Sequence, residues 1–303
     1  MEEPRNHPPE QNCIVTVAGH IGSGKTEVCR KLSAITGWEV ISAGAILRRM
    51  AVKQGMSVLE FNEYVKQHAN IDRDIDDYIA SLAERNESVI VDSRLAWHFL
   101  PKSLKVFLVV EPVIGAQRVF RATRPDENHL SVETAAVDNA ERQRIERQRF
   151  MQLYGLDSDN WRNYDVVLDT SDALPEQAAR VLLERIHAAP PPGSGPQCWL
   201  SPKRLIPTRV TPDPTPDIEI VVAGGVCVIR NGHDRVKAAV QAGTPLVQCS
   251  PIAFESELLP DNLKPLDFAT SHVSRSIVQD WEAALGFRFA TLPHWVLQEA
   301  TVL

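Results

Sequence analysis

A glycine-rich octapeptide, GHIGSGKT, occupies Gly19–Thr26, directly after the apolar run IVTVA and before a helical pattern that continues to about residue 35. An apolar strand, a glycine-rich turn and a helix in this order form a phosphate-binding loop. Its backbone N–H groups turn inward around phosphate oxygens, and the helix N-terminus adds a favourable dipole. Because such a loop needs a buried strand that leads into a helix, the motif predicts an α/β fold.

The loop also predicts how the chain binds ATP and a metal ion. Lys25 would contact the β- and γ-phosphates, and the hydroxyl of Thr26 would hold Mg²⁺, so ATP and Mg²⁺ are the expected cofactors. A purely structural turn is the alternative, and the motif together with its context disfavours it. The predicted ATP-binding residues are Gly19, Gly22, Ser23, Gly24, Lys25 and Thr26.

Four further apolar segments predict the rest of a sheet. Strands are expected near residues 38–42, 88–92, 104–110 and 164–170, with helical patterns between them. Strands this apolar favour a parallel sheet that is covered by helices on both faces. Seven arginines lie within residues 118–149, which suits a lid that closes over phosphates, although several of them must form ordinary ion pairs on a solvated helix.

A proline-rich stretch divides the chain of 303 residues. Residues 188–197 read AAPPPGSGPQ, which cannot continue a helix and predicts a linker. We therefore expect a disordered N-terminus at residues 1–12, a P-loop domain at 13–187 and a smaller α+β domain at 198–303. In the smaller domain, residues 218–230 predict a hairpin, and helices are expected near residues 233–242 and 274–285.

Composition and charge exclude several classes of protein. No run of about 18 apolar residues occurs, so no membrane-spanning helix and no membrane partner are expected. The polar N-terminus is unlike a signal peptide, and five scattered cysteines fit a reducing cytoplasm and argue against structural zinc. A net charge of −7 weighs against strong non-specific DNA binding. The expected location is the cytoplasm.

Two charged residues follow the segment SVIVD. Asp92 ends the predicted strand, where its carboxylate could hold a magnesium-bound water or orient or deprotonate an acceptor hydroxyl; a structural aspartate that turns the chain is the alternative. Arg94 could bind an acceptor or pair with a neighbouring acid. Lys25 and Asp92 are therefore candidate catalytic residues.

The ordered motifs resemble the archaeal-type cytidylate kinases of the nucleoside monophosphate kinase superfamily over about residues 14–183. The matching segments after the P-loop are SAGAILRRM at 42–50, IDRDIDD at 71–77, VDSRLA at 91–96 and ERQRIERQRFMQLYGLDSDNWRNYDVVLDTS at 141–171. The resemblance implies a core sheet, an acceptor-binding helical section and a lid. It implies acceptor-binding residues at Ser42, Gly44, Arg48, Asp72 and Arg94, and catalytic lid arginines at Arg142 and Arg149.

Three positions depart from the pattern of that family. Ser93 stands where the family usually has glycine, Gln143 where it has an acid, and Phe150 where it has tyrosine. These departures leave the expectation of ATP use intact and leave the identity of the acceptor open.

Part of the second domain resembles the ParB/sulfiredoxin-like fold, over about residues 199–249. The strand VCVIR leads into NGHDR at the start of a helix, with Asn231 where that family usually has aspartate. The resemblance implies an anion site at Gly232, His233 and Arg235, where a glycine, a helix N-terminus and a cation would meet a phosphate. The alternative is a structural turn in which His233 caps the helix.

Three functions fit these features. The favoured hypothesis is a kinase that phosphorylates the hydroxymethyl group of 5-hydroxymethyluracil in DNA, like the bacteriophage 5-hydroxymethyluridine DNA kinases, acting in the cytoplasm of a host. The base would then have to leave the helical stack. A CMP or dCMP kinase that acts on the free nucleotide is the first alternative. A nucleotide-gated binding module without catalysis is the second.

Overall fold

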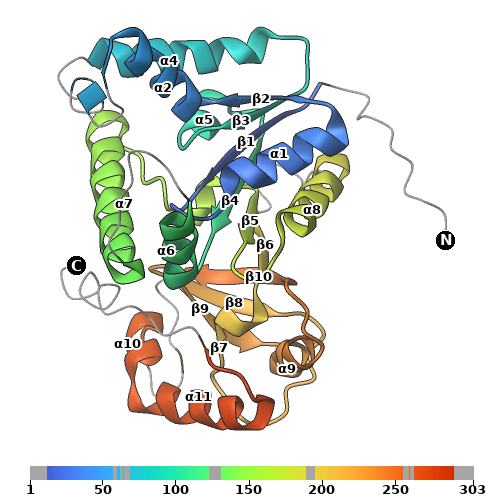
Figure 1. Cartoon of the computed structure of the whole chain (residues 1–303). Coiled ribbons are helices and arrows are strands. Elements are labelled where there is room, and N and C mark those ends of the chain that lie inside the picture. Colours follow the sequence, from blue (N-terminus) through green and yellow to red (C-terminus); the bar gives the residue numbers. More distant parts are fainter. Residues whose placement is uncertain are drawn as a thin grey trace. The chain divides into compact units, whose positions relative to one another are not determined.

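The computed structural model (Figure 1) describes residues 12–56, 60–61, 64, 69–122, 131–188, 195–254, 259 and 263–289, with only the backbone at 69–72 and 253–254. The chain forms two compact units: Met1–Val166 with Leu174–Gly195, and Val167–Ala173 with Pro196–Leu303. The predicted linker spans the point where the chain passes from the first unit to the second. Residues 1–11 lie outside the described part, so the disorder expected there stays a prediction.

A parallel sheet forms the centre of the first unit. Its strands β1 (Ile14–Gly19), β2 (Glu39–Ser42), β3 (Val89–Asp92) and β4 (Leu104–Val109) lie in the order β2–β3–β1–β4, and every pairing among them is parallel. All residues of β3 are buried. Because successive side chains of a strand point to opposite faces, a strand that is buried along its whole length needs cover on both sides. The predicted parallel sheet is therefore confirmed for these four strands.

Helices supply this cover. One face packs on α1 (Lys25–Thr36), which contacts β1, β2 and β3 and also packs on α8 (Pro175–His187) (Figure 1). On the other face, Val89 and Val91 join an apolar cluster with residues of α2, α4 and α5. The remaining helices of this unit have the following bounds: α2 (Ala43–Lys53), α4 (Ala69–Ser81), α5 (Ala96–Phe99), α6 (Pro112–Arg121) and α7 (Val132–Tyr154), with short 3₁₀ turns η1 (Leu82–Glu84) and η2 (Trp161–Asn163).

The long helix α7 is delimited by local sequence signals. Ser131 caps its first turn by accepting a hydrogen bond from Thr134 N–H at 3.2 Å, and the Thr134 hydroxyl in turn accepts one from Ser131 N–H at 3.0 Å. Gly155 ends the helix in the left-handed conformation. This helix carries Arg142 and Arg149, so the predicted lid arginines lie on one continuous helix.

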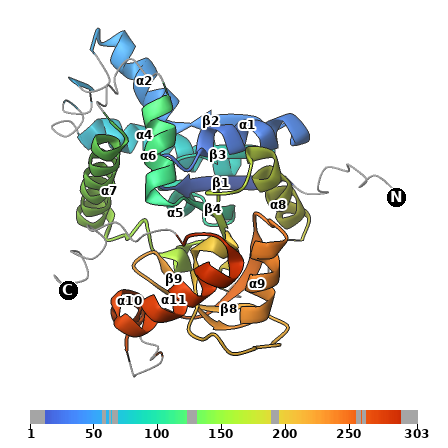
Figure 2. The same cartoon turned by 60° about the horizontal axis from the view of Figure 1, so that its bottom comes forward.

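The second unit contains a mixed sheet in the order β6–β10–β8–β9–β7. The predicted hairpin is confirmed, since β8 (Glu219–Ala223) and β9 (Val226–Asn231) pair in antiparallel fashion. Helices α10 and α11 pack on each other, and α10 contacts the hairpin (Figure 2). The other bounds are β5 (Val166–Asp169), β6 (Gln197–Leu200), η3 (Pro202–Arg204), β7 (Leu205–Ile206), α9 (His233–Gln241), β10 (Val247–Phe254), α10 (Pro265–Thr270) and α11 (His272–Leu285).

Two strands of this sheet, β6 and β7, were not expected from the sequence. Residue 197 falls in the predicted linker, and prolines flank both segments. Strand β6 forms because β10 pairs with it in antiparallel fashion, with Cys198 opposite Cys249. The α+β character of the unit agrees with the prediction, whereas its likeness to the ParB/sulfiredoxin fold stays a prediction.

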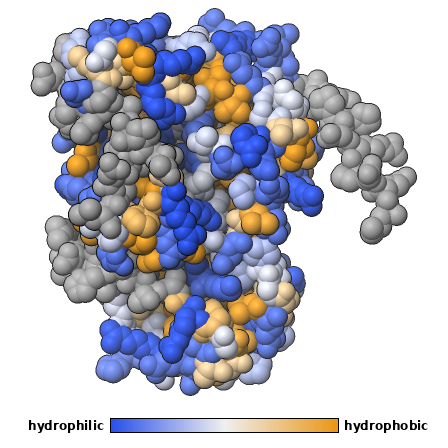
Figure 3. Space-filling model, viewed as in Figure 1, coloured by the Kyte–Doolittle hydropathy of each residue, from blue (hydrophilic) through white to orange (hydrophobic). Residues whose placement is uncertain are grey.

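No helix in the described part of the chain is long and apolar enough to span a membrane. On the face drawn in Figure 3, hydrophilic residues predominate and apolar residues lie in small groups between them.

Candidate active site

The phosphate-binding loop connects β1 to α1 and lies against the backbone of two neighbouring elements. Gly22 has φ +77°, and a Cβ atom at this position would lie 2.3 Å from the carbonyl oxygen of Gly115 in α6. At Gly19 a Cβ atom would lie 2.2 Å from the carbonyl oxygen of Leu108 in β4. Since the obstructing atoms belong to the backbone, only glycine fits at either position. The loop therefore keeps the open backbone cradle that phosphate oxygens require.

Lys25, the first residue of α1, lies folded over this cradle. Its Nζ donates to the carbonyl oxygen of Gly19 at 2.9 Å and to that of His20 at 3.4 Å. Burial, together with the positive charge of Arg94 and against the opposing effect of Asp92, lowers the pKa of Lys25 to about 8. A phosphate would offer this ammonium group a stronger acceptor than the two carbonyl groups.

Asp92 and Thr26 meet at the carboxyl edge of the sheet. Thr26 Oγ1 donates to Asp92 Oδ2 at 3.4 Å, and the strand register places Asp92 opposite Val17 of β1 and Ser42 of β2. Among the described residues no group of three or more His, Cys, Asp or Glu side chains could hold a metal ion. One hydroxyl and one carboxylate beside a phosphate cradle nevertheless fit Mg²⁺, which is usually held by one or two protein oxygens together with phosphates and water.

Arginines converge on the same edge of the sheet. Burial, together with the nearby positive charges of Arg142 and Arg149, lowers the pKa of Arg94 to about 10. The Arg94 guanidinium stays protonated at neutral pH and forms an ion pair with Glu146 of α7. The other oxygen of Glu146 accepts a hydrogen bond from Arg142 Nε at 3.2 Å. The structure therefore brings the two predicted lid arginines to Arg94.

Three of the predicted acceptor-binding residues lie at the start of α2: Ser42 as its N-cap, then Gly44 and Arg48. The Ser42 hydroxyl caps the helix by accepting a hydrogen bond from Ala45 N–H at 3.4 Å. A Cβ atom on Gly44 would lie 3.5 Å from Nη1 of Arg48, so the Arg48 guanidinium lies over Gly44. The side chain of Asp72 lies outside the described residues. The roles of these residues in binding an acceptor stay predictions.

Two acids at this site were missed in the sequence. Glu146 follows Arg142 by four residues, a spacing that is typical of a solvated helical ion pair and therefore does not reveal the contact with Arg94. Asp159 raises the pKa of Arg94 and accepts a hydrogen bond from Gln143 Nε2 at 2.8 Å. Gln143, one of the departures from the family pattern, thus holds an acid near the arginines.

The anion site predicted at the start of α9 needs correction, because the protein fills it with its own carboxylate. Asp213 Oδ2 accepts hydrogen bonds from the backbone N–H groups of Gly232 at 2.8 Å and His233 at 3.2 Å. It also lies 2.7 Å from His233 Nδ1. Gly232 has φ +86°, and a Cβ atom there would lie 2.4 Å from the carbonyl oxygen of Asp217. These donors are therefore not available to an external phosphate.

His233 is a structural residue of the second unit. Its side chain has no exposed surface, and the backbone N–H of Thr208 donates to Nε2 at 3.2 Å. Nε2 is therefore the acceptor nitrogen, and Nδ1 carries the proton that it donates to Asp213. Burial lowers the pKa of His233 despite the hydrogen bond to Asp213. Arg235 is exposed on α9, so the structural alternative describes this turn better than an anion site.

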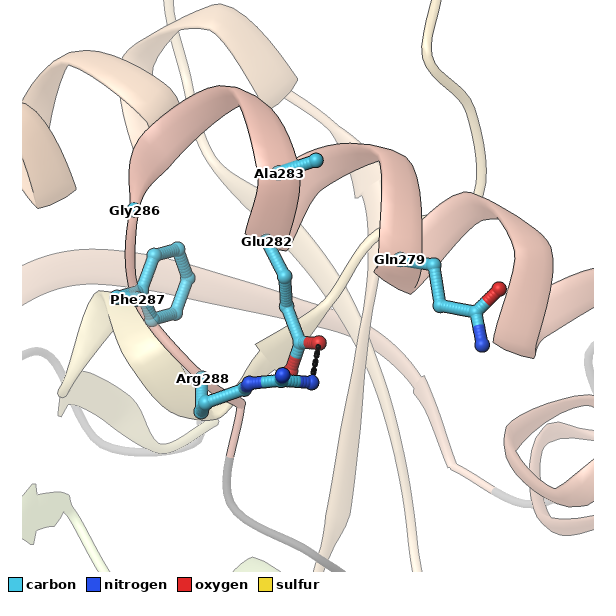
Figure 4. A pocket seen from close by; sticks show the side chains of 6 residues that line it. All are labelled: Gln279, Glu282, Ala283, Gly286, Phe287 and Arg288. Atoms are coloured by element: carbon cyan, nitrogen blue, oxygen red, sulfur yellow. Dashed lines mark hydrogen bonds and ion pairs between the residues drawn. The ribbon is translucent and has the colours of Figure 1, made fainter.

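The second unit also contains an open hollow at the end of α11, shown in Figure 4. Among the described residues that line it, Glu282 carries the only carboxylate, which accepts hydrogen bonds from Arg288 Nη1 at 3.0 Å and from the backbone N–H of Phe289 at 2.9 Å. None of the predicted site residues lines it. The lining residues are Gln279, Glu282, Ala283, Gly286, Phe287 and Arg288.

Comparison with known proteins gives a family match that ends near the end of β5. The model of the cytidylate kinase-like family matches residues 14–172, more than half of the 303 residues. Similar curated proteins include the cytidylate kinases of Thermococcus sibiricus, 36% identical over 181 residues, and Pyrococcus furiosus, 35% identical over 187 residues. These matches span 59% and 61% of this chain and 91% and 94% of the relatives.

Solved structures with similarity to this chain include two shikimate kinases. The enzyme of Bacteroides thetaiotaomicron is 16% identical, with a TM-score of 0.43, and the match covers 58% of this chain and 97% of that chain. The enzyme of Acinetobacter baumannii, in complex with shikimate, is 18% identical, with a TM-score of 0.41, and the match covers 59% of this chain and 95% of that chain.

Proposed function

This chain belongs to the cytidylate kinase-like family and is a phosphotransferase, and we propose that it transfers the γ-phosphoryl group of ATP to the phosphate of CMP or dCMP. The product would be the nucleoside diphosphate. Family membership implies the use of ATP and, as in most kinases, of Mg²⁺. The identity of the acceptor has to be inferred from the residues of the site.

The observation that carries this proposal is the group of cations at the edge of the sheet. Lys25 lies over the loop, Arg94 and Arg142 are near enough to lower its pKa, and Arg142 and Arg149 are near enough to lower the pKa of Arg94. Phosphoryl transfer between two phosphate groups brings several negative charges together, and catalysis consists mainly of positioning them and neutralising their charge. Three arginines and a lysine suit an acceptor that itself carries a phosphate.

The position of Asp92 also favours a phosphate acceptor. An acceptor hydroxyl would need a nearby base, whereas the oxygen of a monophosphate is already ionised at neutral pH. Asp92 instead contacts Thr26, the predicted metal-binding residue. We assign these two residues to the magnesium side of the site, where bound Mg²⁺ would neutralise phosphate charge. Lys25 and the arginines would hold the transferred group and orient the acceptor.

The hypothesis of a hydroxymethyluracil kinase acting on DNA has less support. It drew on the altered acceptor motifs and on the resemblance of the second domain to the ParB/sulfiredoxin-like fold, and the carboxylate of Asp213 occupies the phosphate-binding turn that this resemblance implied. The alternative of a binding module without catalysis conflicts with membership in a kinase family. Hydroxymethyluracil DNA is therefore included as an acceptor in the test below, where its phosphorylation is the competing outcome.

The test is transfer of label from [γ-³²P]ATP in the presence of Mg²⁺. The acceptors are CMP, dCMP, cytidine, and single-stranded DNA with and without 5-hydroxymethyluracil. We expect labelled CDP or dCDP and no label on cytidine or DNA. Lys25→Met is the inactive control, because it removes the ammonium group that binds phosphate. Label on hydroxymethyluracil DNA alone would overturn the proposal.

A further inference from the structure

Helix α7 presents alternating charges to the active site along one face. Arg142, Glu146 and Arg149 are separated by four and three residues, so they lie on the same side of the helix. Arg142 and Arg149 both lower the pKa of Arg94, which shows that this side faces Arg94. Glu146 thus stands between two lid arginines and opposite a third arginine that follows β3.

Glu146 differs from Glu141, a second acid of this helix that forms an ion pair. Its side chain is 22% exposed, and that of its partner Arg94 is 24% exposed. Glu141, by comparison, pairs with Arg144 where the two side chains are 53% and 45% exposed. An exposed pair of this kind contributes little. Glu146 instead binds the partly buried guanidinium of Arg94 and the guanidinium of Arg142 at the same time.

A carboxylate and a phosphate offer the same kind of acceptor to a guanidinium group. Glu146 engages Nη1 of Arg94 and Nε of Arg142, so an acceptor phosphate that binds these two groups competes with the Glu146 carboxylate. We propose that Glu146 is a positioning residue that substitutes for the acceptor phosphate in the empty site and releases both arginines when that phosphate binds. This inference rests on the proposed function for the identity of the acceptor. It goes beyond that function by making Glu146 set the affinity and selectivity for anionic acceptors.

Selectivity follows from the competition. A neutral acceptor such as cytidine has no group that replaces the Glu146 carboxylate, so the arginines stay engaged with α7. An acceptor with a phosphate exchanges one anion for another and frees the helix from Arg94. Glu146 therefore lowers the affinity for acceptors that carry a phosphate, and only those acceptors release the arginines from α7.

The test compares Glu146→Gln with Glu141→Gln, which removes the same charge from the same helix at an exposed pair. Binding of CMP and of inorganic phosphate is measured by isothermal titration calorimetry, and KM and kcat are measured with CMP. We expect Glu146→Gln to lower Kd for both ligands and KM for CMP by about three- to tenfold, without raising kcat. We expect less than about a twofold change in Glu141→Gln, because its pair is solvated.

Inorganic phosphate separates this inference from the proposed function. If Glu146→Gln binds phosphate more tightly but neither form of the protein binds CMP, Glu146 is still the competing anion. The proposal that CMP is the acceptor is then wrong. Equal effects in the two variants, or weaker phosphate binding in Glu146→Gln, would overturn the role of Glu146. Unchanged ATP binding verifies the fold of each variant. If Glu146→Gln does not fold, Glu146→Asp tests the same point, because its shorter carboxylate cannot hold both arginines.

Discussion

ATP binding by this protein should depend on pH in a range where an ordinary lysine does not titrate. Burial and, to a smaller extent, the charge of Arg94 together lower the pKa of Lys25 to about 8. The protonated ammonium group of Lys25 binds phosphate. The fraction of the protein that carries protonated Lys25, and with it the affinity for ATP, therefore falls as the pH rises through 8. Raising the pH from 7.5 to 9 is the simplest perturbation.

The expected size of the effect follows from this pKa. With a pKa of about 8, the protonated fraction of Lys25 in the empty site falls about eightfold between pH 7.5 and pH 9. Neighbouring groups do not titrate in this window, since the pKa of Arg94 is about 10 and burial raises that of Cys29. The dissociation constant of ATP should therefore rise about eightfold over the same interval.

The assay is calorimetric titration with ATP in two buffers that differ in their enthalpy of ionisation. At pH 9 the bound phosphates should restore the charge of Lys25, so close to one proton should be taken up for each ATP that binds. Lys25→Arg serves as the control, because a guanidinium stays charged to pH 9 and should flatten the dependence. An ATP affinity equal at pH 7.5 and pH 9, with no proton uptake, would refute the reasoning.

Three further predictions concern the metal side of the site and the second unit. Asp92→Asn should lower kcat on the order of 10²-fold in the presence of Mg²⁺, and unchanged turnover would remove Asp92 from the metal site. Gly232→Ala should lower the free energy of unfolding by about 2 kcal/mol more than Gly225→Ala, measured by urea denaturation, because both positions have positive φ but only Gly232 lacks space for a Cβ atom; equal losses would contradict this. The second unit should unfold at lower temperature at pH 5 than at pH 7.5. Its folded state keeps His233 neutral and Asp213 ionised, so the unfolded chain binds more protons as the pH falls below about 6.5. The Asp213→Asn variant should unfold at a lower temperature than the parent protein, because it loses the carboxylate that pairs with His233. An unfolding temperature of the parent protein that does not change with pH in calorimetry would refute a neutral His233 paired with an ionised Asp213.

Local sequence determined the catalytic loop, because a P-loop is formed by adjacent residues. The apolar strand, the glycines and the helix that follow one another within residues 14–36 required no distant contact to be recognised, and the structure places them as predicted. The apolar strands β3 and β4 were predictable for a similar reason, since strands buried on both faces are apolar throughout. Strand β6 was not, because its partner β10 lies about 50 residues further along the chain.

Only the tertiary structure decided what the charged residues outside the loop do. Asp213 lies among prolines, 20 residues before His233, yet it occupies the donors that predicted an anion site at the start of α9. Glu146 looks like half of an ordinary helical ion pair until β3 brings Arg94 against it. A helix N-terminus or a guanidinium accepts any anion that reaches it, and the chain supplies its own carboxylate from a distance that sequence periodicity does not encode.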